Sequence, residues 1–241
     1  MKSNSQPHSE TKDRLLLAAL HAFGQRDYDG VSTREIVEEA EANISAISYH
    51  FGGKQELYLA TVTYLADKLH AGIVDQFSRI EQIAKDATPN QCASMLCQFL
   101  GHFLEHMLLG EVGMHAPGII FREQNQPTAA FDILYEKLLE PMHCILATLV
   151  ARYRGKAPTD QDVIIMTHAL LGQTIIFRLG RTTLLRRLNQ SAYIPSVIQQ
   201  FKTQLSSYTL SVLNSTPDNP GPVNNGNHSP CLTITLTGEN C

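Results

Sequence analysis

The apolar residues of this chain recur at helical intervals along almost its whole length. Before residue 214, apolar side chains return every three or four positions, which is the spacing that gathers them on one face of a helix. No strand-like alternation of any length appears in that part of the chain. The pattern therefore predicts an all-α protein.

Breaks in this pattern divide the chain into helices that begin or end at proline, glycine and capping residues. Beyond the first fifty residues, the expected helices are 54–85, 91–109, 128–153, 160–181 and 191–213. Between the second and third of these, Gly113, Pro117, Gly118 and Pro127 predict a loop with only a short helix. Pro141 falls inside the helix expected over 128–153 and predicts a kink there.

Residues 31–57 show a tighter pattern, with two short helices joined by a turn and the start of a third. Ser32 and Glu35 form a capping box, because the hydroxyl can bind a free backbone N–H while the carboxylate reaches back. Asn43 can cap the second helix, which two glycines end at 52–53. Two short helices joined by such a turn form the unit that places its second helix in the DNA major groove.

The outward face of the second helix carries residue types that suit DNA. With Ile47 buried, a rotation of 100° per residue points Ser45 and Tyr49 away from the core. Hydroxyls can serve several bases, a methyl group can contact thymine, and Tyr or His can bind phosphate oxygens. The residues expected at the DNA are Thr33, Arg34, Ser45, Ala46, Ser48, Tyr49, His50 and Lys54. An ordinary helical hairpin with a solvated polar face explains the spacing equally well.

Three features of the first sixty residues match a known family. They are an apolar helix over 15–23, the run Gly-Val-Ser-Thr-Arg-Glu-Ile over 30–36, and Tyr-His-Phe over 49–51 followed by Lys54 and Leu57. With these features, residues 11–60 resemble the DNA-binding domain of the TetR family of transcriptional regulators.

The resemblance implies a role for each part of this domain. It assigns the phosphate backbone to Thr33, Tyr49 and Lys54, and it places Ser45, Ala46 and Ser48 near bases. Glu41 departs from the family pattern, since the family usually has glycine at that position of the turn. We therefore expect an uncommon backbone conformation at Glu41.

Composition does not by itself indicate a protein that binds nucleic acid. The chain has 19 Lys and Arg against 23 Asp and Glu, a net charge of −4, and its first 70 residues carry seven basic and ten acidic side chains. A protein that held DNA through charge alone would be basic. Because the acids cluster over 27–41, off the proposed contact surface, we expect local positive potential at Arg34, His50, Lys54 and the helix N-termini.

Two later stretches, 119–145 and 167–187, place charged groups among apolar residues. Buried ions need partners, so these groups either pair with one another or line a cavity, and the sequence supports both readings equally. The candidate ligand-binding residues are Arg122, Glu123, Tyr135, His168, Phe177 and Arg178. A basic cluster over 178–187 could attract an anionic effector, although a solvated helix end is the simpler reading.

These two stretches resemble the C-terminal domain of CecR-like TetR regulators. The resemblance then covers about residues 10–213. It implies a homodimer in which the last two long helices of each copy form a four-helix interface.

Catalytic and metal-binding patterns are weak in this chain. Its five cysteines follow no metal spacing and no disulfide framework. His102 and His106 could face one metal ion, but further ligands with a telling spacing are missing, which favours histidines that line a helical pocket. No phosphate-binding glycine loop or nucleophile motif is present. We expect no enzymatic activity, no cofactor and no metal ion.

The expected organisation is a flexible N-terminus over 1–9, a three-helix helix-turn-helix domain over 10–54, a helical-bundle domain for ligand binding and dimerisation over 55–213, and a disordered tail over 214–241. The tail is rich in proline, glycine and asparagine. The first residues lack the apolar core of a signal peptide, and no apolar run approaches the roughly 18 residues that cross a bilayer. A cytoplasmic protein without membrane contact is expected.

Together these patterns predict a ligand-responsive repressor. Its partners would be double-stranded operator DNA, a small organic effector and a second copy of the chain, and the effector would release it from a palindromic operator. The family resemblance implies that the regulated genes serve transport or detoxification. The alternative is a soluble helical protein that binds a small molecule but no DNA, which only the acidic N-terminal balance supports.

Overall fold

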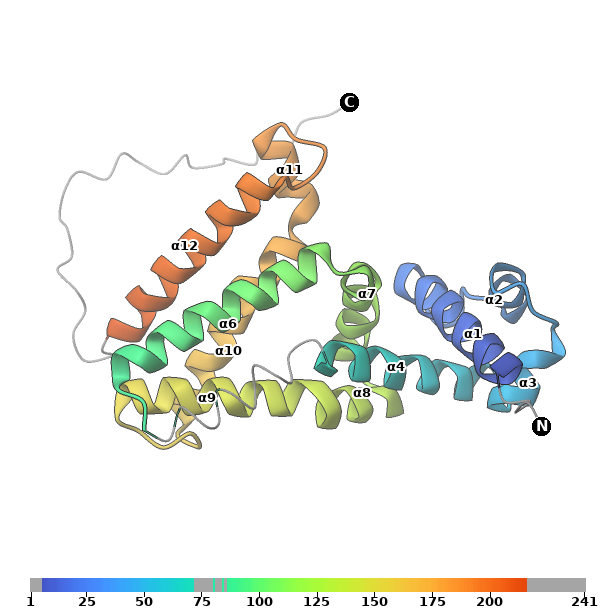
Figure 1. Cartoon of the computed structure of the whole chain (residues 1–241), viewed down its shortest axis with the longest axis horizontal. Helices are drawn as coiled ribbons and strands as arrows, with labels where there is room; N and C mark the ends of the chain where they lie inside the picture. Colours follow the sequence, from blue (N-terminus) through green and yellow to red (C-terminus); the bar gives the residue numbers. More distant parts are fainter. Residues whose placement is uncertain (1–5, 72–79, 81–83, 85, 216–241) are drawn as a thin grey trace, which may run out of the picture.

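The computed structural model describes residues 6–71, 80, 84 and 86–215, and every regular element within them is a helix (Figure 1). The elements are α1 (Gln6–Gln25), α2 (Thr33–Glu39), α3 (Ser45–Phe51), α4 (Lys54–Ala71), α6 (Pro89–Leu109), α7 (Glu111–Asn125), α8 (Ala129–Leu134), a π-helical turn η1 (Tyr135–Leu139), α9 (Glu140–Arg154), α10 (Gln161–Leu179), α11 (Arg181–Leu188) and α12 (Pro195–Asn214). The predicted all-α class is confirmed.

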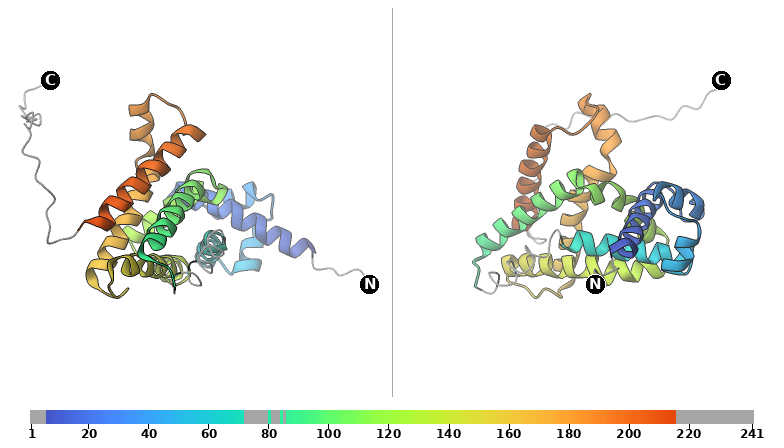
Figure 2. Two further views of the ribbon diagram at one scale, coloured as in Figure 1. Left: turned by 60° about the vertical axis from the view of Figure 1, so that its left-hand side comes forward. Right: turned by 45° about the vertical axis from the view of Figure 1, so that its right-hand side comes forward.

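The first three helices form a group at one end of the molecule, and α4 leads from this group into the larger bundle (Figures 1 and 2). One end of α4 packs on α1 and α3, while its later turns pack on α8 and η1. The expected boundary at residue 54 therefore falls at the start of a continuous helix that belongs to both parts. α1 begins at Gln6, so the segment 1–9 predicted to be flexible is helical from that residue.

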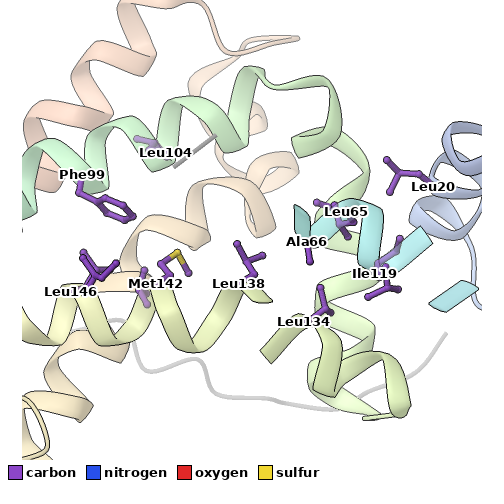
Figure 3. Close-up of a cluster of buried hydrophobic side chains, with 14 of the residues drawn as sticks. Leu20, Leu65, Ala66, Phe99, Leu104, Ile119, Leu134, Leu138, Met142 and Leu146 are labelled. Atoms are coloured by element: carbon purple, nitrogen blue, oxygen red, sulfur yellow. The ribbon is translucent and has the colours of Figure 1, made fainter. Parts of the chain in front are cut away.

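The hydrophobic core is continuous across this joint. Figure 3 shows Leu20 of α1 and Leu65 of α4 in one cluster with Ile119 of α7 and Leu134 of α8. Each of these four residues exposes at most 2% of its surface. Because close-packed side chains transmit displacement, a movement of α7 would also shift the first helices.

Helix α7 corrects one prediction. The sequence favoured a loop over most of 110–127, but residues 111–125 form a continuous helix with Pro117 inside it. The glycine at 118 serves a close helix crossing, because a Cβ atom there would lie 2.0 Å from the carbonyl oxygen of Gly24 in α1. A proline costs a helix one hydrogen bond, and packing against α1 offsets that loss.

We expect Gly118→Ala to destabilise the protein by about 1–3 kcal/mol, because the added methyl group would overlap backbone atoms that cannot move alone. Urea unfolding followed by far-ultraviolet circular dichroism at one protein concentration measures the loss. Gly101→Ala is the matched control in α6, where the new Cβ would meet only the flexible Lys202 side chain at 3.4 Å. Equal stability of the two variants would contradict the close crossing.

The segment 128–153 is also not a simple kinked helix. Thr128 caps it as predicted, with its hydroxyl accepting from the N–H of Ala130 at 3.1 Å. Instead of a kink at Pro141, the turn η1 widens just before it, and the N–H of Glu140 donates to the carbonyl of Tyr135. This extra residue places Pro141 in the first turn of α9, where a missing N–H costs nothing.

The other predicted helices are largely confirmed. Thr88 caps α6 with a capping box to Gln91, and α4 forms from Lys54 to Ala71. Most of 72–85, the rest of the helix predicted to begin at 54, lies outside the described residues, as does 216–241 of the predicted tail. The sequence missed α11, because the pattern over 160–181 and the gap before 191 hid a helix that starts after Gly180.

Helix α10 has an unusual exposed face. By length and composition it is apolar enough to cross a membrane, with a mean hydropathy of 1.3, which corrects the expectation that no such stretch exists. Polar residues such as His168 and Gln173 interrupt this apolar stretch. A search of the sequence for an uninterrupted apolar run therefore does not find it. Its exposed apolar residues are Ile164, Ile165, Ile176 and Leu179, and α12 adds Tyr208 and Leu210.

Candidate DNA interface and effector cavity

The first helix of the candidate DNA-binding unit, α2, is fixed by its cap. The Ser32 hydroxyl accepts from the N–H of Glu35 at 3.2 Å, and the Glu35 carboxylate accepts from the N–H of Ser32 at 3.2 Å. The same carboxylate binds Arg26 at 2.9 Å, and this bond lowers the pKa of Glu35. The predicted capping box is confirmed, and it ties α2 to the end of α1.

The turn between α2 and α3 has the backbone that the sequence predicted. Glu41 has a φ of +50°, in the left-handed region that a glycine would occupy more easily. The Asn43 side chain accepts from the N–H of Ser45 at 3.1 Å, so it caps the start of α3. Gly52, with a φ of +93°, ends the helix.

The exposed face of α3 agrees with the helical rotation inferred from sequence. Ile47 is buried, whereas Ser45 and Ser48 are exposed, with Ala46 and His50 half-buried beside them. Tyr49 exposes 73% of its surface, which is unusual for so large an aromatic side chain. A helix that presents an aromatic ring with small polar side chains can enter a groove and touch both bases and phosphates.

Three further candidates lie at the ends of neighbouring helices. Arg34 pairs with Glu38 at 3.0 Å, but both groups are so exposed that exchanging the carboxylate for a phosphate costs little. Lys54 starts α4, with its ammonium 4.3 Å from the centre of the Tyr28 ring. Thr33 is the first residue of α2. The structure thus brings the predicted residues onto α3 and the helix starts beside it.

Two of the candidate ligand residues form the joint between α7 and the first helices. The Arg122 guanidinium donates to the carbonyls of Phe23 and Arg26 at 3.0 and 2.7 Å, and to the Asp27 carboxylate at 3.0 Å. Arg122 thereby holds the C-terminal end of α1, where free carbonyls need donors. Arg122 is thus ion-paired, which is one of the two alternatives that the sequence left open, and together with Glu123 it also lines a hollow of about 1030 Å³.

Glu123 points the other way from the same turn of α7. It is buried, with 1% of its surface exposed, and its carboxylate accepts from the Tyr58 hydroxyl at 2.7 Å. It also accepts from the N–H and the hydroxyl of Thr128 at 3.0 and 2.9 Å. Burial and the hydrogen bond to Glu123 raise the pKa of Tyr58. Glu123 therefore joins α7 to α4 and to the start of α8.

A cavity of about 360 Å³ lies within the larger bundle. Its walls come from α6, α7, the η1–α9 segment and α10, with Leu69 from the end of α4. The apolar side chains that line it include Phe103, Met107, Ile120, Leu138, Met142 and Ile175. Leu138 and Met142 also belong to the buried hydrophobic cluster drawn in Figure 3. A concave apolar site of this size suits a small organic ligand.

The sequence identified only part of this cavity. His168 and Arg178 line it, whereas Tyr135 stacks on Phe131 at a ring distance of 6.1 Å and Phe177 on Phe201 at 4.5 Å. His106, considered above as a pocket histidine, also lines the cavity, and His102 faces a separate hollow beside α12. The apolar lining was missed because it has the same helical spacing as ordinary core.

Metal coordination has no structural support. Among the residues that the structure describes, no group of three His, Cys, Asp or Glu could hold a metal ion. Glu105, beside the two histidines on α6, pairs with Lys202 at 2.9 Å, which lowers the pKa of that carboxyl.

Comparison with known proteins now decides the family. The profile of bacterial regulatory proteins of the tetR family matches residues 15–61, and that of the C-terminal domain of the HTH-type transcriptional dual regulator CecR matches residues 93–215. CecR of Shigella flexneri is 32% identical to this chain over 203 residues, which cover 83% of this chain and 88% of CecR. The chain belongs to the TetR family of transcriptional regulators.

TetR membership confirms the resemblance seen in both parts of the sequence. It decides for a transcriptional regulator with a DNA-binding domain and an effector domain, and against a helical protein that binds no DNA. TetR regulators are not enzymes, so the absence of catalytic motifs is accounted for.

Solved TetR structures share the fold. A TetR-family regulator of Mesorhizobium loti superposes with a TM-score of 0.58 at 18% identity, covering 87% of this chain and 98% of that chain. AibR, solved in complex with isovaleryl coenzyme A and operator DNA, superposes with a TM-score of 0.60 at 16% identity, covering 82% and 97% of the two chains.

Proposed function

We propose that this TetR regulator is a repressor that binds a palindromic operator as a homodimer and leaves it when a small organic molecule fills the cavity. One observation carries the proposal. Helix α7 lines the cavity with Ile120 and Phe121. The next two residues hold neighbouring elements, because Arg122 binds the end of α1 and Glu123 binds Tyr58 of α4. A ligand that displaces α7 therefore pulls on both anchors at once.

The thermodynamics of release follow from this coupling. A ligand shifts an equilibrium between two conformations only if it binds one of them more tightly. The cavity must therefore bind the effector more tightly in the conformation whose DNA-binding domains do not fit the operator. Reciprocity then requires that operator DNA weakens effector binding by the same factor. Couplings of about 1–3 kcal/mol, or roughly 5- to 150-fold, are typical.

Dimerisation is proposed through α10 and α12. Both helices expose large apolar residues, among them Ile165 and Ile176 on α10 and Tyr208 on α12. Contiguous exposed apolar surface commonly marks an interface, and in a symmetric dimer the same surface faces itself. The two α3 helices would then lie about 34–36 Å apart, one turn of DNA. We also propose a cytoplasmic location, because the operator DNA lies there.

Loss of phosphate contacts is expected to weaken binding to all DNA. Tyr49→Phe and Lys54→Ala should each lower affinity about equally for operator and unrelated duplexes, and Lys54→Ala should reduce the salt dependence by about one phosphate per subunit. Fluorescence anisotropy on duplexes chosen from a random pool, over a salt series, measures both. Lys156→Ala, which removes an ammonium paired with Asp162 far along the chain, is the matched control.

Changes at Ser45 and Ser48 should act differently, because these side chains are assigned to bases. Ser45→Ala and Ser48→Ala are expected to change which sequences the protein selects, with little effect on its binding to unrelated DNA. Repeating the selection with each variant tests this. Equal loss on every sequence would overturn the assignment of base contacts.

The direction of regulation and the target genes belong to the same proposal. We propose repression of neighbouring genes for transport or detoxification. The Shigella relative carries the name of a dual regulator, so a reporter assay at the chain's own promoter must give the sign. Deleting the gene should raise transcription there. A fall would assign activation instead.

A further inference from the structure

Few polar groups line the effector cavity. Apart from His106, Gln124, His168 and Arg178, its lining is apolar. The two histidines and the glutamine can donate or accept a hydrogen bond, whereas Arg178 only donates and carries a permanent charge. Among the described residues that line the cavity, none is a carboxylate. The site therefore suits a ligand that is apolar along its body and polar at a few points.

Three carboxylates on the surrounding helices are engaged elsewhere. Asp67 of α4 pairs with Lys137 at 2.7 Å, Glu105 of α6 pairs with Lys202 at 2.9 Å, and Glu123 of α7 binds Tyr58 at 2.7 Å. Residues 163–215, which include nearly all of α10 and the whole of α11 and α12, contain no Asp or Glu. A cationic ligand would find no opposite charge in this wall of the cavity.

Positive charge, in contrast, is concentrated near one end of the cavity. Arg178 is half-buried in the last turn of α10, and burial, with the nearby charge of Arg181, lowers its pKa. The dipole of α10 also favours a cation at its end. An anion placed there would gain a charge-assisted bond to Arg178 and would offset the repulsion between Arg178 and Arg181.

The cavity runs along one face of α10. Its lining follows that helix from His168 to Leu179, which is about 16 Å at the helical rise of about 1.5 Å per residue. Apolar side chains line most of this stretch, and Arg178 lies near one end of it. A ligand with an apolar body and one charged end matches this arrangement.

We propose that the effector is an organic anion, with its apolar body in the cavity and its anionic group at Arg178. This inference rests on the proposed role of the cavity as the effector site. It predicts that charge of the head group, at a constant apolar body, decides binding.

Three probes with the same ten-carbon chain isolate the head group: sodium decanoate, 1-decanol and decylammonium chloride. Calorimetric titration of the full-length protein should rank decanoate first and decylammonium last. Arg178→Gln should weaken decanoate about 10- to 100-fold, the usual range for a charge-assisted bond, and should leave decanol within about 2-fold. Arg187→Gln removes an equal charge from the exposed face of α11 and should change neither.

The outcomes separate the two proposals. Equal binding of the three probes, or an equal effect of the two arginine variants, would overturn the anionic head while leaving an effector site possible. Decanoate that binds through Arg178 but does not change operator affinity would support the ligand class and contradict the release of DNA. Decanoyl-coenzyme A tests which chemical group supplies the negative charge. If it binds and decanoate does not, the anionic group is a phosphate and not a carboxylate.

Discussion

Replacing Glu123 by alanine is expected to lower the free energy of unfolding by about 2 kcal/mol or more. The carboxylate is almost fully buried and accepts three hydrogen bonds, from Tyr58 and twice from Thr128. Truncation leaves the buried Tyr58 hydroxyl without an acceptor, which costs about 1–3 kcal/mol, and it opens a gap between α7, α4 and α8. Thr128 is exposed, so its two donors can bind water instead. Urea unfolding by circular dichroism measures the sum.

Two variants control this result. Glu123→Gln keeps the shape but opposes one donor with an amide N–H₂, so an intermediate loss is expected. Glu136→Ala removes an exposed carboxylate from η1 and should stay within about 0.5 kcal/mol of the wild type. A loss below about 1 kcal/mol for Glu123→Ala would show that the joint does not depend on this residue.

Replacing Arg122 by methionine is expected to uncouple the cavity from DNA. The aliphatic length of the side chain is kept, but the three bonds to Phe23, Arg26 and Asp27 are lost. The ligand should then bind with unchanged affinity, operator DNA should also bind, and the effect of one on the other should fall from the typical 5- to 150-fold to about 2-fold. The reason is that α7 would move without carrying α1.

The coupling is measured by operator affinity with and without the compound that most raises the melting temperature of the wild type. Arg152→Met, at an exposed arginine of α9, is the matched control and should retain full coupling. If Arg122→Met released operator as the wild type does, the signal would have to travel through α4 alone.

Local features of the fold could be predicted from sequence. The capping boxes of Ser32 and Thr88 involve residues three positions apart, and the end of α3 at Gly52 needs only that residue's freedom at positive φ. Helix α7 could not be predicted in this way. Whether a glycine breaks a helix or lets another helix approach depends on the partner, and Gly24 lies 94 residues before Gly118.

The same distinction holds for the sites. The exposed side chains of α3 that we propose for DNA contact follow from rotation about a single helix, so their exposure was predicted. The partners of Arg122 and Glu123 lie up to 99 residues away in the chain, and the sequence showed only that such groups need partners. The residues that line the cavity differ from core residues only because they face an empty space. The spacing of apolar residues along the sequence does not show that difference.

The most direct test of the account is the ratio of two affinities of the full-length protein at about 0.15 M salt. One is for the DNA upstream of its own gene, and the other is for a scrambled duplex of equal length and composition. The account predicts that the upstream DNA binds at least about 10³-fold more tightly, as is typical of specific regulators. A ratio near one would contradict the proposal that this chain represses its own promoter.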